Sequence, residues 1–148
     1  YVKHIRAIDF SAEMIAIAQG KAEAENIQNV TFEQATIEDL DIPEQSLDMV
    51  LGLSILHLLR DKEAAIAHVY QMLKPGGLFV TSTVCIGDTM SWFKLIAPVG
   101  RFLGLLPFVQ VLTVQSLADS LTQAGFELDY QWQPNKSSAV FIVAKKPK

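Results

Sequence analysis

The stretch Ile5-Arg6-Ala7-Ile8-Asp9 decides the fold class, because it has the pattern of a short buried strand that ends in a carboxylate. A helix is predicted directly after it, with Ser11 as the N-cap. Apolar residues then recur at helical spacing up to about residue 24, namely at Met14, Ile15, Ala18 and Ala22. In doubly wound folds that bind nucleotides, an acid at the end of such a strand binds a ribose, about 20 residues after a glycine-rich turn. The strand and its acid are found in this sequence without the glycine-rich turn.

The remaining sequence alternates between strand and helix patterns. Further strands are predicted over residues 30–35, 47–53, 78–84, 127–133 and 139–144. Helices are predicted over residues 61–73 and 116–124, the second with Ser116 as N-cap and Gly125 as its stop. Lys74-Pro75-Gly76-Gly77 is predicted to end the first of these helices in a tight turn. Because helices separate most of the strands, we expect an α/β fold with a mostly parallel sheet and a C-terminal antiparallel hairpin.

Composition indicates one domain over residues 1–148. The chain has 148 residues and a mass of 16.4 kDa, and half of its residues are hydrophobic, so a sizeable core can form. The net charge of −4 and the scattered Lys and Arg residues argue against a nucleic-acid partner. The single cysteine, Cys85, excludes an internal disulfide and, with three distant histidines, leaves no spacing typical of a metal site. We therefore expect a reducing, cytoplasmic setting, and the first residues lack the pattern of a secretion signal.

One segment, residues 88–112, is too apolar for an exposed loop. Its charged residues and its breaks at proline and glycine make it a poor membrane span. The segment must therefore cover another part of the protein, bind a lipophilic molecule or contact another subunit. A plain pair of helices packed on the sheet remains an alternative. The large side chains in question include Trp92, Phe93 and Phe102.

Four blocks of sequence carry a resemblance to a known family. They are Ala7-Ile8-Asp9-Phe10-Ser11-Ala12-Glu13-Met14, Ile42-Pro43-Glu44-Gln45-Ser46-Leu47-Asp48-Met49-Val50, Leu56-His57-Leu58 and Leu73-Lys74-Pro75-Gly76-Gly77-Leu78. In this order and spacing they resemble the class I S-adenosylmethionine-dependent methyltransferases, especially the small-molecule branch that includes the ubiquinone and menaquinone methyltransferases. The resemblance implies a Rossmann-like sheet, from the family's second strand to its last. The family's first strand and Gly-rich loop, which lie between the strands at 5–9 and 47–53, have no counterpart in this sequence.

The resemblance implies that five residues bind the adenosine part of the cofactor S-adenosylmethionine. Asp9 would accept hydrogen bonds from both ribose hydroxyls, with Phe10 also among the binding residues, and Met14 would lie against the adenine ring. Thr36 stands where family members often have an Asp that accepts a hydrogen bond from the adenine amino group; its hydroxyl can accept that bond without charge assistance. The backbone N–H of Ile37 would donate to an adenine nitrogen. Asp9 as a helix N-cap or solvated acid, and Met14 as a core residue, remain alternatives.

The resemblance places the methionine part of the cofactor at the strand over residues 47–53. Gly52 and Leu53, at the carboxyl end of that strand, would line its pocket. His57 is a candidate general base that faces the substrate, and a structural role for this histidine is the alternative. A lid over the substrate would include Trp92, Phe93 and Phe102.

The leading functional hypothesis is an S-adenosylmethionine-dependent methyltransferase that acts on a small, lipophilic acceptor. Methyl transfer mainly requires that the protein align donor and acceptor and exclude water, so few catalytic side chains are obligatory. The alternative is a catalytically inactive methyltransferase-like module that binds a partner or forms oligomers, and a dehydrogenase comes third. Without the Gly-rich loop, we expect binding of S-adenosylmethionine to be weak or lost. Without the first strand, two strand edges would be open, so we expect a homo-oligomer such as a dimer, or strand exchange, to cover the sheet.

Overall fold

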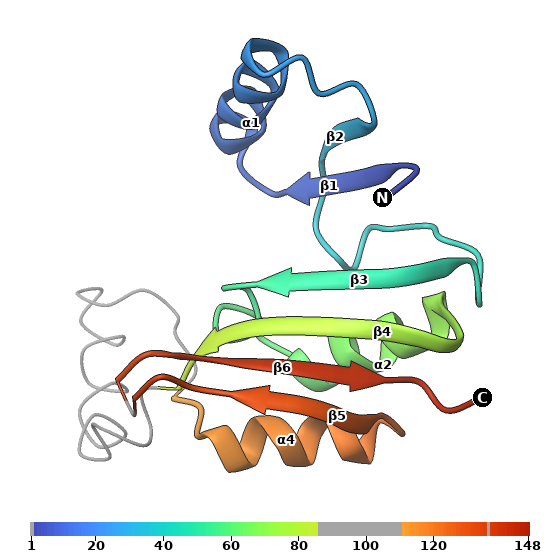
Figure 1. Ribbon diagram of the computed structural model, residues 1–148, viewed down its shortest axis with the longest axis vertical. Coiled ribbons are helices and arrows are strands. Elements are labelled where there is room, and N and C mark those ends of the chain that lie inside the picture. Colours follow the sequence, from blue (N-terminus) through green and yellow to red (C-terminus); the bar gives the residue numbers. More distant parts are fainter. Residues whose placement is uncertain (1, 86–110, 136) are drawn as a thin grey trace. The chain divides into compact units, whose positions relative to one another are not determined.

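The computed structural model describes residues 2–85, 111–135 and 137–148, which form a mixed α/β fold (Figure 1). Its elements are β1 (Ile5–Asp9), α1 (Ala12–Ala24), β2 (Val30–Gln34), β3 (Leu47–Leu53), α2 (Lys62–Met72), β4 (Leu73–Val84), α4 (Val114–Gln123), β5 (Glu127–Trp132) and β6 (Ala139–Lys145). The α/β class predicted from the sequence is confirmed. The chain divides into two compact units, Tyr1–Asp41 and Ile42–Lys148, and each is described by itself. A single domain over residues 1–148 therefore stays a prediction.

The first unit is a parallel pair of strands connected by a helix. Strand β1 pairs with β2 over its whole length, from Ile5 opposite Val30 to Asp9 opposite Gln34. The connecting helix α1 has Ser11 as its N-cap, as predicted, and the Ser11 hydroxyl accepts a hydrogen bond from the backbone N–H of Met14 at 3.3 Å. Because the two strands run in the same direction, their carboxyl ends lie next to each other.

The second unit is a four-stranded sheet in the order β3-β4-β6-β5. Strand β3 is parallel to β4, whereas β6 is antiparallel to both of its neighbours, so β5 runs in the same direction as β3 and β4. The predicted C-terminal antiparallel hairpin is thus confirmed. Helices α2 and α4 pack together on one face of this sheet (Figure 1). The core between them is made of fully buried apolar side chains, which include Ile66, Val69, Phe79, Leu117, Leu121 and Ile142.

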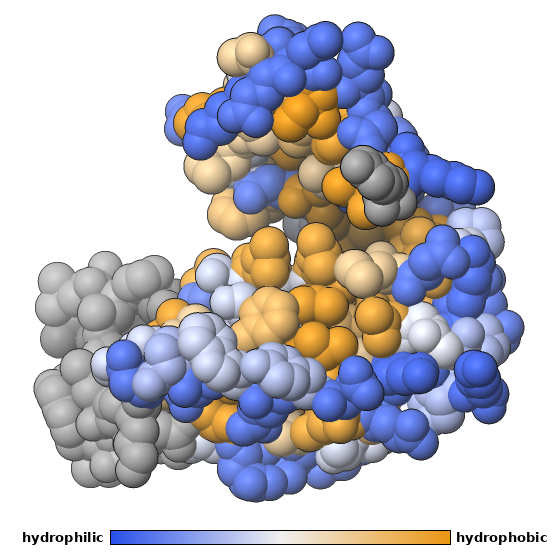
Figure 2. All heavy atoms as spheres, in the orientation of Figure 1, coloured by the Kyte–Doolittle hydropathy of each residue, from blue (hydrophilic) through white to orange (hydrophobic). Residues whose placement is uncertain are grey.

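The opposite face of the four-stranded sheet is apolar and much less covered. Alternate residues of β3 lie on this face, and their side chains are about half exposed, at 49% for Met49, 53% for Leu51 and 58% for Leu53. Leu51 is paired with Val80 of β4, Val80 with Val143 of β6, and Val143 with Tyr130 of β5, so the same face continues across all four strands. Figure 2 shows the apolar residues gathered over β3 and β4. Among the described residues, β3 pairs on one side only, so it also presents an open strand edge.

The start of α4 corrects one prediction. The N-cap is Thr113 rather than Ser116. The Thr113 hydroxyl accepts a hydrogen bond from the Ser116 backbone N–H, and the Ser116 hydroxyl accepts one from the Thr113 backbone N–H, both at 3.0 Å. This reciprocal pair is a capping box, which satisfies two backbone donors that a helix N-terminus leaves unpaired. Ser116 therefore occupies the third helical position, and the helix begins one turn earlier than predicted.

The Lys74-Pro75-Gly76-Gly77 block also differs from its prediction. Helix α2 ends at Met72, close to the predicted position, but β4 begins at once at Leu73 and includes the whole block. Gly76 has a φ of +80°, as expected for a glycine in a turn, and its N–H donates to the carbonyl of Lys146 at 2.9 Å. The block is therefore an irregular start of β4 that pairs with the chain just after β6.

Candidate functional site

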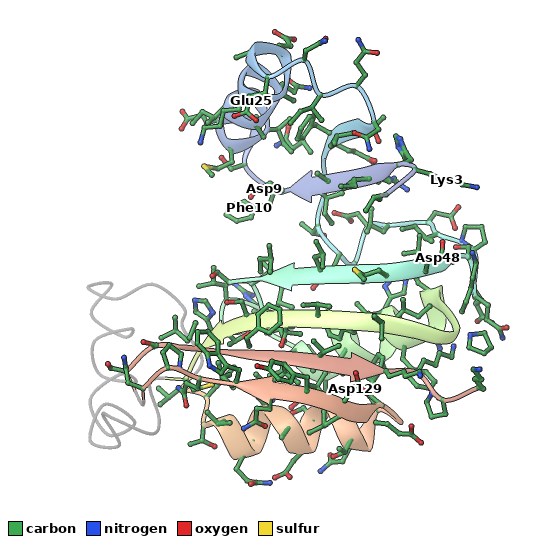
Figure 3. The ribbon with its side chains drawn as sticks, viewed as in Figure 1. Lys3, Asp9, Phe10, Glu25, Asp48 and Asp129 are labelled. Atoms are coloured by element: carbon green, nitrogen blue, oxygen red, sulfur yellow. The ribbon has the colours of Figure 1, made fainter. Side chains whose placement is uncertain are left out.

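Asp9 ends β1 at the carboxyl edge of the parallel strand pair (Figure 3). The backbone N–H of Ser11 donates to Asp9 Oδ1 at 2.8 Å, which fixes the direction of the half-buried carboxylate. Because Ser11 is the N-cap of α1, the alternative that Asp9 caps the helix is excluded. No described residue donates a hydrogen bond to the second oxygen, Oδ2. That oxygen can therefore accept hydrogen bonds from a ligand.

Exposed apolar side chains lie next to Asp9 in sequence. Phe10 is 66% exposed, and Figure 3 shows it beside Asp9 at the end of β1. Its carbonyl accepts a hydrogen bond from the side-chain amide of Gln34 at 3.0 Å, which ties the residue to the neighbouring strand. Met14, in the first turn of α1, is 53% exposed. A large apolar surface at the end of a strand is suited to contact with a flat, partly apolar ligand.

Thr36 and Ile37 follow β2 directly. The backbone N–H of Ala35 donates to the carbonyl of Asp9 at 3.1 Å, so the pairing of the strands continues for one residue beyond Gln34. The Thr36 hydroxyl then donates to Asp39 Oδ2 at 2.7 Å. No described residue accepts a hydrogen bond from the Ile37 N–H, which leaves this donor available to a ligand. The structure thus brings together Asp9, Phe10, Thr36 and Ile37 at one edge of the first unit.

Asp39 is a residue that the sequence analysis missed. It bonds to Thr36 through its side chain and also donates its backbone N–H to the Thr36 carbonyl at 3.3 Å. The signal that could have found it is the spacing Thr-x-x-Asp, because a short polar side chain often bonds to groups a few residues away in a turn.

Gly52 and Leu53 lie at the carboxyl end of β3, in the second unit. Gly52 is buried, and a Cβ at this position would lie 3.1 Å from Phe79 Cε2, so a larger residue does not fit without movement of the ring. Leu53 is 58% exposed. The chain then turns sharply at Ser54, whose φ is +56° and whose N–H donates to the Ser82 carbonyl at 2.7 Å. This turn leads the chain away from the sheet toward His57.

His57 lies in the loop between β3 and α2, where its side chain is half-buried. Its Nδ1 atom is buried and has no hydrogen-bond partner among the described residues. Burial lowers the pKa of His57 from its ordinary value of 6.5, because the charged imidazolium is less well solvated there. The ring is therefore neutral at pH 7 and can accept a proton.

The predicted site residues fall in both units. The first unit holds Asp9, Phe10, Met14, Thr36 and Ile37, and the second holds Gly52, Leu53 and His57. The residues predicted to face the substrate, Trp92, Phe93 and Phe102, lie outside the described residues. Within the described ranges, no group of three His, Cys, Asp or Glu residues is arranged to hold a metal ion. No helix among the described residues is long and apolar enough to cross a membrane.

Comparison with known proteins identifies relatives for most of the chain. A family model described as a methyltransferase domain matches residues 2–131. An uncharacterized methyltransferase of Bacillus subtilis strain 168, YcgJ, is 31% identical over 80 residues, which are 54% of this chain and 32% of the relative. The malonyl-[acyl-carrier protein] O-methyltransferase of Bacillus cereus is 35% identical over 80 residues, which are 54% of this chain and 28% of the relative. The ubiquinone biosynthesis O-methyltransferase of Paramagnetospirillum magneticum is 29% identical over 103 residues, which are 70% of this chain and 40% of the relative. The chain thus matches less than half the length of these relatives.

Solved structures share the fold at low sequence identity. A putative methyltransferase of Bacillus halodurans superposes with a TM-score of 0.81 at 14% identity, over 100% of this chain and 85% of that chain. The YcgJ protein of Bacillus subtilis superposes with a TM-score of 0.77 at 16% identity, over 100% and 84%. These likenesses show a Rossmann-like fold. Because the methyltransferase model covers residues 2–131 and the fold agrees with it, the chain belongs to the class I S-adenosylmethionine-dependent methyltransferase family.

Proposed function

We propose that this chain binds S-adenosylmethionine and forms the catalytic part of a methyltransferase that acts on a small, lipophilic acceptor in the cytoplasm. The observation that carries the proposal is the state of the Asp9 carboxylate. One of its oxygens is held by the Ser11 N–H at 2.8 Å, and the other has no donor among the described residues. A fixed acceptor at the carboxyl end of a parallel strand suits a pair of neighbouring ribose hydroxyls.

The residues around Asp9 fit the adenosine end of the cofactor chemically. The exposed Phe10 and Met14 side chains provide apolar and polarisable contacts for an aromatic base. The Thr36 hydroxyl and the Ile37 N–H, which follow the neighbouring strand, offer an acceptor and a donor for the polar edge of adenine. In this proposal the first unit binds adenosine, while Gly52 and Leu53 stay the residues that the resemblance assigns to the methionine part.

When bound, the cofactor supplies a methyl group that is activated by a positively charged sulfur, so the protein mainly has to align the acceptor with it. His57 is proposed to take the proton that a hydroxyl acceptor loses. Its burial supports this role, because a lowered pKa keeps the imidazole in its basic form at neutral pH.

The proposed acceptor is lipophilic because of the composition of residues 88–112. Trp92, Phe93 and Phe102 are proposed to contact it, and the exposed side chains of β3 add apolar surface in the same unit. Two of the relatives named above act as O-methyltransferases, which supports an oxygen atom as the methyl acceptor.

We also propose that a second copy of the chain, in a dimer or by strand exchange, covers the open sheet. The support is the edge of β3, which pairs on one side only among the described residues and carries exposed apolar side chains. Light scattering should give twice the mass of the chain; a mass of 16.4 kDa at all concentrations would contradict the dimer.

The test of the function is cofactor affinity in an Asp9→Ala variant. S-adenosylhomocysteine, the demethylated product, is titrated into the chain up to millimolar concentration, so that weak binding is also detected. Loss of the carboxylate should weaken binding about tenfold or more, since hydrogen bonds to charged groups contribute roughly 1.5–3 kcal/mol. Glu23→Ala, which removes an exposed acid of α1, is the matched control and should leave the affinity unchanged. Equal affinities of Asp9→Ala and the unchanged chain would refute the role of Asp9.

A further inference from the structure

The hydroxyl of Thr36 has a fixed hydrogen-bond direction. Its oxygen lies 2.7 Å from Asp39 Oδ2, a distance typical of a charge-assisted hydrogen bond. An ionised carboxylate has no proton to give, so Thr36 must be the donor. The Thr36 backbone N–H lies 3.4 Å from the same oxygen, and the Asp39 N–H donates to the Thr36 carbonyl at 3.3 Å. Asp39 is therefore held against Thr36 by contacts on both its side chain and its backbone.

This arrangement decides what Thr36 can offer to a ligand. A free hydroxyl can donate one hydrogen bond and accept up to two, and it rotates to suit its partners. Once its proton is directed at Asp39, only the lone pairs of Thr36 Oγ1 remain. The bond to a negative charge also polarises the hydroxyl and makes its oxygen a stronger acceptor. Thr36 thus becomes an acceptor-only group, although its own side chain is neutral.

Thr36 lies at the edge of the first unit where the ribose-binding acid is proposed. Asp9 and Gln34 are register partners at the ends of β1 and β2, and the bond from Ala35 N–H to the Asp9 carbonyl extends this pairing toward Thr36. Neighbouring strands are about 4.8 Å apart, so a ribose at one strand end leaves its base near the other.

We propose that Asp39 is a positioning residue for adenine recognition: it holds the Thr36 hydroxyl as an acceptor for the exocyclic amino group and excludes bases with an oxo group there. This proposal rests on the proposed function, since it assumes that adenosine binds at the ends of β1 and β2. It gives Thr36 the charge assistance that its own side chain lacks. A purely structural role for Asp39, closing the loop after β2, predicts a different result.

The experiment compares two ligands that differ at the polar edge of the base. S-adenosylhomocysteine carries an amino donor, whereas S-inosylhomocysteine carries an oxo acceptor at the same carbon and a proton on the adjacent N1, so the Ile37 N–H also contributes to the preference in every variant. We expect the unchanged chain to bind the amino ligand about tenfold more tightly. Asp39→Ala frees the Thr36 hydroxyl to rotate and donate, so the preference for the amino ligand should fall several-fold, through weaker binding of the amino ligand and unchanged or tighter binding of the oxo ligand.

Two further variants test whether Asp39 orients the Thr36 hydroxyl or only closes the loop after β2. Asp39→Asn keeps an oxygen that can accept from Thr36 but removes the charge, and it should give an intermediate preference. Glu38→Ala removes the neighbouring exposed acid, which has no hydrogen bond to Thr36 in the structure, and it should leave the preference unchanged. A dispersed amide spectrum of each variant checks that it is folded.

The outcomes are distinct. If Asp39→Ala weakens both ligands equally, or leaves the preference as it was, Asp39 only closes the loop and the inference is wrong. Equal binding of both ligands by the unchanged chain also overturns it, while the proposed function stands. If the unchanged chain binds neither ligand at millimolar concentration, the proposed adenosine site itself is refuted, and this inference with it.

Discussion

Gly52, one of the predicted site residues, packs closely on Phe79, because a Cβ there would lie 3.1 Å and 3.3 Å from two atoms of the buried ring. Gly52→Ala should therefore lower the free energy of unfolding by about 1–3 kcal/mol, as overpacking of a well-filled core does. Gly20→Ala is the matched control, since nothing lies within 4 Å of the added Cβ in the middle of α1. It should raise stability by about 0.5–1 kcal/mol. Urea denaturation measures both, and an unaffected Gly52→Ala protein would contradict the packing argument.

His57 should make stability depend on pH. Its pKa is lowered in the folded chain below the ordinary value of 6.5, so between these two pKa values the unfolded chain binds more protons than the folded one. The stabilising contribution of the neutral ring is therefore complete above about pH 6.5 and is lost as the pH falls through the folded-state pKa.

His57→Gln removes this titration. The denaturation midpoints of the unchanged chain and the variant are compared at about pH 8 and about pH 5. The midpoint of the variant, relative to that of the unchanged chain, should be higher at the acid pH than at the alkaline one. The comparison is made between the two proteins at each pH, because carboxylates also titrate over this range. A constant difference between them at the two pH values would show that burial of His57 does not disfavour its charged form.

The site could be predicted from the sequence only in part. Asp9 was recognised as the acid that ends a predicted strand, and strand ends can be recognised from the pattern of apolar residues. Gly52 came from the family resemblance, which places it near the carboxyl end of the strand over residues 47–53. Asp39 was missed because its role depends on a hydrogen bond to Thr36, which requires the shape of the loop after β2. Whether any of these residues contacts a ligand is a property of a complex and stays a prediction.

At the scale of elements, the C-terminus of helix α2 is capped by the side chain of Lys146, which lies far away in the sequence. The Lys146 ammonium donates to the carbonyls of Tyr70 at 2.7 Å and Leu73 at 2.9 Å, and it lies 4.5 Å from the centre of the Tyr70 ring. A cation at this position satisfies carbonyls that a helix C-terminus leaves unpaired, and it interacts favourably with the helix dipole. Lys146 thus joins the chain after β6 to the start of β4.

Lys146→Met keeps the length of the side chain and removes the charge. It should lower the free energy of unfolding by about 1–3 kcal/mol, because two carbonyls lose a charged donor. Lys145→Met, one residue earlier, is the control, since no hydrogen bond of the Lys145 side chain is found among the described residues, and a change within about 0.5 kcal/mol is expected. Equal destabilisation by the two substitutions would contradict the capping role.

Most elements were predicted correctly because each has a local signal. Ser11 marked the start of α1, Gly125 marked the end of α4, and the strand patterns gave the C-terminal hairpin. The start of α4 was misplaced because Thr113 and Ser116 are both good N-caps, and the choice depends on a reciprocal capping box in the folded backbone. The glycines after α2 were taken for a plain turn because their pairing with Lys146 joins residues about 70 positions apart.

At the scale of the whole molecule, the fold class was the most predictable property. The alternation of strands and helices requires a parallel sheet, and the structure has parallel pairs at β1–β2 and β3–β4. The sequence alone could not give the division into two compact units, which depends on how many contacts each unit makes within itself. Each unit carries part of the predicted site, so the central claim can be tested on the first unit's residues within the intact chain.

The most direct test is a map of backbone amide shifts on titration of the intact chain with S-adenosylhomocysteine. The account predicts the largest shifts at the ends of β1 and β2, around Asp9 to Ser11 and at Thr36 and Ile37, with smaller ones near Gly52 and Leu53. In Asp9→Ala the same resonances should need a higher ligand concentration to shift. Shifts confined to other parts of the chain, or none at millimolar ligand, would contradict the assignment of this edge as the cofactor site.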